Sequence, residues 1–116
     1  MTMEKYSRQQ SPKWPAVTVR KNGSLCLNRK AIEQFKLEGM RLATLHYDKK
    51  EGIIGIKPLD DGSDLSAFRI SKEKNRTCVI SCQAFLKHCK IPYKEGSKIY
   101  RAGWDEKAKM ILVKIG

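Results

Sequence analysis

The sequence predicts a mostly β protein with short helices, arranged as two tandem β-β-α-β-β repeats. Residues 68–115 keep the order of hydrophobic, turn and polar segments found in residues 16–57, although few identities are shared. The alignment needs one small insertion before Arg76 and another at residues 91–94. Among the matched pairs are Glu38-Gly39 with Glu95-Gly96, and Tyr47-Asp48 with Trp104-Asp105.

The first repeat begins with a predicted β-hairpin. Residues 16–20 alternate apolar and polar side chains, many of them β-branched, which is typical of a strand. Asn22-Gly23 then supplies the strongest short-range hairpin signal, since both residue types accept positive φ. Residues 25–27 form the returning strand.

A short helix and a second hairpin complete this repeat. Asn28 is a good N-cap for a helix over residues 29–36, and Gly39 is available for a left-handed turn after it. Strands follow over residues 42–47 and 53–57. A helix of about two turns is not stable alone, so it must pack on the sheet.

An acidic linker with Gly and Ser, residues 58–67, leads into the second repeat. We expect a strand over 68–70, a charged loop over 71–76 and a strand over 77–80. Ser81 would cap a helix over 82–90, longer than the first and stopped by Pro92. Strands over 97–102 and 110–115 would end the chain. The predicted organisation is a flexible basic arm (1–15) and one barrel domain (16–116), made of repeat 16–57, linker 58–67 and repeat 68–116.

The charge balance indicates a polyanionic partner. The chain has 24 Lys and Arg against 12 Asp and Glu, a formal net charge of +12. Nucleic acid fits such an excess best. A membrane surface is disfavoured because the cations do not follow one amphipathic helix, and no apolar run approaches the ~20 residues of a membrane span. The beginning of the chain lacks a secretory signal, so we expect a cytoplasmic protein. The alternative is a basic protein with no such partner.

Cysteine and histidine spacing does not favour a metal site or catalysis. The Cys78, Cys82 and Cys89 spacing contains no paired CxxC, and small buried residues are the preferred interpretation, Cys26 included. His46 alternates with apolar neighbours in a predicted strand, as a structural residue would. Neither a catalytic motif nor a phosphate-cradling Gly loop is present. We expect no enzyme activity, no cofactor and no metal.

The order strand, Gly turn, strand, capped helix, Gly turn, strand, turn, strand resembles the AbrB/SpoVT/MazE-like swapped-hairpin family. The segments that carry the resemblance are Gly23 to Asn28 and Phe35 to Gly39. Asn28 stands where the family usually has Pro, and Met40 where it has an acidic residue. In that family two copies close one barrel, so the resemblance implies tandem repeats closing a pseudo-two-fold swapped-hairpin barrel within one chain. It also implies DNA binding, as a transcriptional regulator.

The resemblance places DNA contacts on the first strand, its turn and the helix start. Cations at those positions would neutralise phosphates, and Asn22 would hydrogen-bond to backbone or base. The candidate residues are Arg20, Lys21, Asn22, Arg29 and Lys30, with Lys72, Lys74 and Arg76 in the second repeat. A solvated basic face is the alternative interpretation. The alternative function is a protein-interaction or assembly module, antitoxin-like or phage-associated, acting as a homo-oligomer or on a protein partner.

Overall fold

The computed structural model describes residues 12–60, 62–73 and 76–116. The part of the chain it describes is mostly β, as predicted, and its strands form one antiparallel sheet in the order β5-β3-β4-β9-β8-β1-β2-β7-β6. The elements are β1 (Ala16–Arg20), β2 (Ser24–Leu27), α1 (Arg29–Gln34), β3 (Leu42–Asp48), β4 (Ile53–Leu59), β5 (Phe68–Arg69), β6 (Ser71–Lys72), β7 (Cys78–Ser81), α2 (Gln83–His88), β8 (Lys98–Asp105) and β9 (Met110–Lys114).

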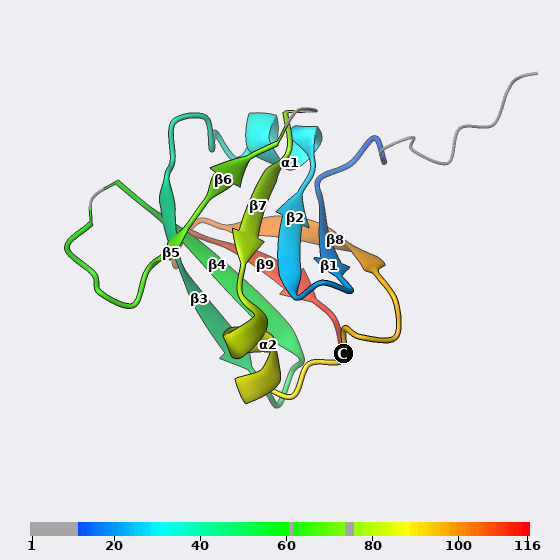
Figure 1. Ribbon diagram of the computed structural model, residues 1–116. Helices are drawn as coiled ribbons and strands as arrows, with labels where there is room; N and C mark the ends of the chain where they lie inside the picture. The colour runs from blue at the N-terminus through cyan, green and yellow to red at the C-terminus, as the bar shows by residue number, and fades with distance from the viewer. Residues whose placement is uncertain (1–11, 61, 74–75) are drawn as a thin grey trace, which may run out of the picture.

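The sheet curls into a nearly closed barrel because its two outermost strands are consecutive in the chain. β5 pairs with the start of β3, and β6 pairs with β7. Only Ile70 lies between them, and its N–H donates to the Arg41 carbonyl at 2.7 Å. The two short helices lie at opposite ends of this barrel (Figure 1).

The β1–β2 hairpin has a three-residue loop. Arg20 pairs with Ser24, and the Gly23 N–H donates to the Arg20 carbonyl at 3.0 Å. Gly23 alone takes positive φ (86°) in this loop, so the turn is a type I turn followed by a bulge, and Asn22 needs no left-handed conformation. In the β6–β7 turn, Arg76 takes the corresponding position with φ 57° and donates its N–H to the Glu73 carbonyl.

The two helices begin differently. Asn28 caps α1 as predicted, because its Oδ1 accepts a hydrogen bond from the Ala31 N–H at 2.9 Å. The prediction that Ser81 caps α2 is wrong: Ser81 remains in β7, paired with Ser24, and the N-cap is Cys82, whose side chain makes no capping hydrogen bond to the helix. The second helix is also no longer than the first, since each spans 6 residues.

The two helices end in the same way. Lys36 and Lys90 follow them with φ 54° and 56°, so lysine rather than Gly39 makes the left-handed turn directly after α1. Leu37 then donates its N–H to the Ile32 carbonyl, as Ile91 does to the Leu86 carbonyl, both at 2.9 Å. This is the Schellman arrangement, and it folds an apolar side chain back under each helix.

Several strand ends differ from the prediction. β4 continues through Pro58 and Leu59, which pair with Ala43 and Leu42 and therefore belong to the sheet rather than to the linker. The expected strand over 68–70 is interrupted at Ile70, and part of the expected loop over 71–76 forms β6. β8 extends to Asp105 because the β8–β9 ladder continues to the pair Asp105 and Met110.

The barrel interior is filled by the alternate side chains of the strands, and a helix covers each end. Fully buried side chains include Leu25, Leu27, Ile54, Ile56, Ile80, Leu86 and Ile111. Each such side chain stabilises the fold by about 1.5–3 kcal/mol through the apolar surface it removes from water. Cys26, Cys78 and Cys82 are buried as expected, whereas Cys89 is only partly buried. Within the described residues, no helix is long and apolar enough to span a membrane.

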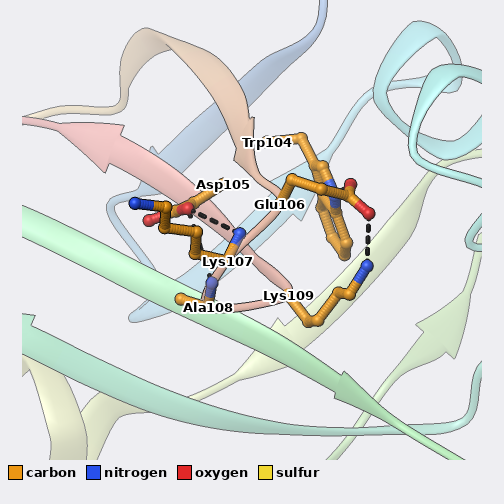
Figure 2. Close-up of polar contacts among 6 residues, drawn as sticks. All are labelled: Trp104, Asp105, Glu106, Lys107, Ala108 and Lys109. Atoms are coloured by element: carbon orange, nitrogen blue, oxygen red, sulfur yellow. Dashed lines mark hydrogen bonds and ion pairs between the residues drawn. The ribbon is translucent and has the colours of Figure 1, made fainter.

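The β8–β9 turn orients Trp104 towards α1. Its ring stacks on Phe35 with 5.9 Å between centroids, and its Nε1 donates to a Glu106 carboxylate oxygen at 2.8 Å. Lys109 pairs with the same carboxylate and lowers the pKa of Glu106 (Figure 2). Asp105 accepts the backbone N–H groups of the turn, from Lys107 at 3.0 Å and Ala108 at 3.4 Å. Trp104 is therefore part of the fold's packing.

Candidate nucleic-acid interface

Three of the predicted DNA-contact residues converge where the β6–β7 turn meets α1. Arg29 comes from the first turn of α1, Lys72 ends β6, and Arg76 lies in the β6–β7 turn, which approaches α1 at one end of the barrel (Figure 1). All three line a hollow of 380 Å³. We call this the mixed hollow, because its other lining residues are Ile32, Glu33, Glu38, Glu73, Thr77 and Cys78.

The carboxylates of the mixed hollow offset part of its positive charge. Glu33 accepts from Arg29 at 2.8 Å, one helical turn away along the exposed surface of α1. Such an exposed pair contributes only about 0.3–0.5 kcal/mol, so a phosphate can displace the carboxylate from Arg29 at little cost. The mixed hollow can therefore accept an anion, but with less positive potential than its cations alone would create.

Arg20 has a different environment from the one expected. Its guanidinium pairs with Glu73 at 2.9 Å and donates to the Cys26 sulfur at 3.1 Å. Burial raises the pKa of the Cys26 thiol, and the neighbouring Arg20 opposes that rise. Arg20 thus ties β1 to β2 and to the β6–β7 turn, and its charge is already partnered.

Lys21 and Asn22 lie at the other end of the barrel. Their turn packs against α2, where the Cys82 N–H donates to the Gly23 carbonyl at 3.1 Å. Lys21 donates its backbone N–H to Ser97 Oγ at 3.0 Å, and Asn22 Oδ1 accepts from Ser24 Oγ at 2.6 Å. The structure therefore separates these two residues from the mixed hollow.

The two remaining candidates do not line the mixed hollow. Lys30 is exposed in the first turn of α1, next to Arg29. Lys74 lies outside the described residues, as does Asn75. The structure describes the arm from residue 12 onwards. The Arg101 guanidinium lies over the Trp14 ring, 5.2 Å from its centroid, and the Trp14 carbonyl accepts a hydrogen bond from Asn28.

Sequence reasoning missed a second group of cations beside the first. Arg41 and Arg69 join Lys72 around a hollow of 690 Å³, whose other lining residues are Gly39, Met40, Leu42 and Ile70. We call it the edge hollow, because it lies where the chain leaves β3 and crosses to β7. Among the residues that the structure describes, no carboxylate lines it. Nothing in the local pattern of the sequence points to it, since it depends on the pairing of Arg69 with Leu42.

His46 and Cys82 have surroundings typical of structural residues. His46 Nε2 lies 2.9 Å from Thr44 Oγ1, the residue two positions earlier on β3. Burial raises the pKa of the Cys82 thiol to about 12, which keeps it protonated at neutral pH. Within residues 12–60, 62–73 and 76–116, no group of three or more His, Cys, Asp or Glu side chains is placed to hold a metal ion.

Comparison with family models, curated proteins and solved structures finds no match to this chain.

Proposed function

We propose that this protein binds DNA through the phosphate backbone, as a transcriptional regulator of the AbrB-like type, and has no catalytic role. The observation that carries the proposal is the convergence of Arg29, Lys72 and Arg76 at one hollow, from segments far apart in the sequence. Arg41 and Arg69 extend this set of cations around the edge hollow. Arginine and lysine in such a group are the usual donors to phosphate oxygens.

We infer that the two halves are copies related by a pseudo-two-fold axis, as in a swapped-hairpin barrel. The strand registers support this inference. Val19 pairs with Leu25 as Lys72 pairs with Cys78, and Tyr47 pairs with Ile54 as Trp104 pairs with Ile111.

The position of the hairpin turns supports the same inference. The β1–β2 turn packs on α2 of the other half, where the Cys82 N–H donates to Gly23. The β6–β7 turn lines the mixed hollow with α1 of the first half. Each half therefore covers the helix of the other, so neither hairpin has a complete set of contacts within its own half.

Affinity for DNA should depend strongly on salt. Each phosphate neutralised adds about −0.9 to the slope of log affinity against log salt concentration. The five cations around the two hollows would give a slope of roughly −4 if most of them contact phosphate. Glu33, Glu38 and Glu73 reduce the local potential, so binding should be tight only at low salt.

The test is fluorescence anisotropy of a labelled random duplex, titrated at several salt concentrations. The double variant Arg29→Gln/Arg76→Gln should reduce the salt slope by about 2, because two phosphate contacts are lost. The matched control is Lys50→Gln/Lys87→Gln, which removes the same charge from exposed positions, one in the β3–β4 turn and one in α2. Equal slopes for the two double variants would contradict the proposed interface. No binding below about 100 μM at low salt would contradict DNA binding itself.

The proposed location follows from the proposed ligand. A DNA-binding protein of this kind would be cytoplasmic and associated with the nucleoid. A fluorescent fusion of the full chain should coincide with stained DNA, and the Arg29→Gln/Arg76→Gln variant should spread through the cell. A fusion that never coincides with DNA would contradict this location.

A second candidate function is assembly with another copy of the chain. The outer face of β4 and β9 carries a hollow of 290 Å³ lined in part by Ile53, Met110 and Leu112. It lies over Gly55, at which a Cβ atom would be 2.7 Å from the Met110 sulfur. The strand alternation places Asp48 and Lys57 at the rim of this face, so a second copy could offer opposite charges.

Light scattering at low and high salt would test self-association. An apolar interface should persist at high salt and be lost in the Leu112→Glu variant, whereas a strictly monomeric wild type would exclude this function.

A further inference from the structure

The edge hollow combines two features that small-ligand sites share. Its cations, Arg41, Arg69 and Lys72, surround a space of 690 Å³, and Met40, Leu42 and Ile70 supply half-buried apolar surface. Pockets of about 300–1,000 Å³ with an apolar lining and a few convergent polar groups are the usual form of a ligand site. In this respect the edge hollow differs from the mixed hollow, where three Glu carboxylates lie among the cations.

The path of the backbone explains why the cations gather here. Arg69 pairs with Leu42 across β5 and β3, so its side chain is directly beside the start of β3. The Ile70 N–H donates to the Arg41 carbonyl, and the chain then crosses to pair with β7 as β6. Arg41 and Lys72 therefore lie on the two sides of the crossing. Among the described residues, none of the three cations forms an ion pair.

The charge and the apolar surface together indicate the class of ligand. Three cations, with no carboxylate among the described lining residues, favour a group with more than one negative charge. The planar fork of arginine fits phosphate oxygens in pairs. The apolar side chains beside them suit the face of a planar ring, as an extruded base stacks between aromatic or apolar side chains in a protein pocket.

We propose that the edge hollow binds a nucleoside phosphate unit. Arg41, Arg69 and Lys72 hold the phosphate, and Met40, Leu42 and Ile70 contact the base. The unit can be a free nucleotide or one nucleotide of an unpaired strand, since both present the same phosphate and base. This site goes beyond the proposed duplex binding, which needs only backbone phosphates and no accessible base.

The test uses the full chain and a labelled single-stranded oligothymidylate, with binding followed by anisotropy. Arg41→Gln/Arg69→Gln should weaken binding at least tenfold, an order-of-magnitude estimate for losing two charge-assisted contacts. The control Lys50→Gln/Lys87→Gln removes the same charge elsewhere and should change binding by no more than about twofold, since exposed charges act only through the general field. Circular dichroism and urea denaturation should match the wild type, because Arg41 and Arg69 are exposed.

Competition separates the two sources of the ligand. If thymidine 5′-monophosphate displaces the oligothymidylate, and does so less well for Arg41→Gln/Arg69→Gln, the free nucleotide is a ligand. If only the oligothymidylate binds and the same variant weakens it, the ligand is a nucleotide within a strand. Either result supports the site. Met40→Ser should weaken both probes but leave any binding of inorganic phosphate unchanged.

Two results would overturn the proposal. One is equal loss of oligothymidylate binding for the edge-hollow variant and the control variant. The other is competition by inorganic phosphate as effective as that by thymidine 5′-monophosphate, which would exclude a role for the base. Duplex binding is measured separately with Arg29→Gln/Arg76→Gln, so failure of the proposed DNA-binding function and failure of the edge hollow are distinguishable.

Discussion

Arg20 and Glu73 form an ion pair with 2.9 Å between Nη1 and Oε1, and it links the strand before the first hairpin turn to the second hairpin turn. Both side chains are partly exposed, at 33% and 44%. The pair therefore joins the two halves of the chain across the outer surface of the barrel, and it offsets the charge of one of the cations predicted to contact DNA.

The first prediction concerns the energy of this pair. A double-mutant cycle with Arg20→Ala and Glu73→Ala should give a coupling of about 0.2–1 kcal/mol, because solvent screens partly exposed pairs. Urea denaturation in low and high salt measures it, and the coupling should shrink with salt. Arg20→Ala should cost more than Glu73→Ala, since it also removes the hydrogen bond to Cys26. A coupling above about 2 kcal/mol would contradict the screening argument.

The second prediction concerns Asn28, which joins three segments. Its Oδ1 accepts from the N–H groups of Ala31 and Ala16, at 2.9 and 3.0 Å, and its Nδ2 donates to the Trp14 carbonyl at 3.0 Å. Asn28→Ala should lower the free energy of unfolding by about 2–3 kcal/mol, because it removes a helix cap and leaves a buried N–H unpaired. Asn28→Asp keeps both acceptor bonds and should cost less. Equal losses for the two variants, measured by urea denaturation, would contradict this role.

The third prediction compares two glycines with nearly the same φ. Gly23 and Gly39 have φ of 86° and 87°. A Cβ at Gly23 would lie 2.8 Å from Gln83 Cβ, whereas one at Gly39 would meet nothing within 4 Å. Gly39→Ala should cost about 1 kcal/mol from its left-handed conformation alone. Gly23→Ala should cost about 1–3 kcal/mol more, because the turn must move away from α2. Thermal unfolding of both variants would measure the difference, and equal costs would mean that the turn does not pack on α2.

The fourth prediction concerns stability at high pH. Burial raises the pKa of Cys82 from 9.0 to about 12, so the unfolded chain loses this proton at lower pH than the folded one. The stability that this thiol contributes is complete below pH 9 and is lost as pH rises towards 12. The slope is up to about 1.4 kcal/mol per pH unit from this group. Cys82→Ala should remove that part of the slope, measured by urea denaturation between neutral and alkaline pH. An unchanged slope would contradict the buried, protonated thiol.

The sequence by itself determined the class of fold and most of its elements. Alternation in residues 16–20 and the Gly23 turn predict the first hairpin because strand period and turn chemistry are local properties. Asn28 predicts the α1 cap for the same reason. Ser81 is also a residue type that favours an N-cap, but its pairing with Ser24 of β2 keeps it in β7, so the predicted cap is wrong. The prediction ended β4 before Pro58 because proline is disfavoured within strands. In the structure Pro58 nevertheless pairs with Ala43, so β4 continues through it.

Only the tertiary structure decided which cations lie together. Eight residues were predicted as DNA contacts from their place in each half. In the structure the hairpin of each half meets the helix of the other half. Lys21 and Asn22 therefore lie beside α2, whereas Arg76 lies beside α1. Arg20 is partnered by Glu73, and Arg41 and Arg69 replace it as unpaired cations near Lys72 among the described residues. Charge is a property of composition, but a binding surface depends on which strands pair, and that pairing is a long-range property of the nearly closed barrel.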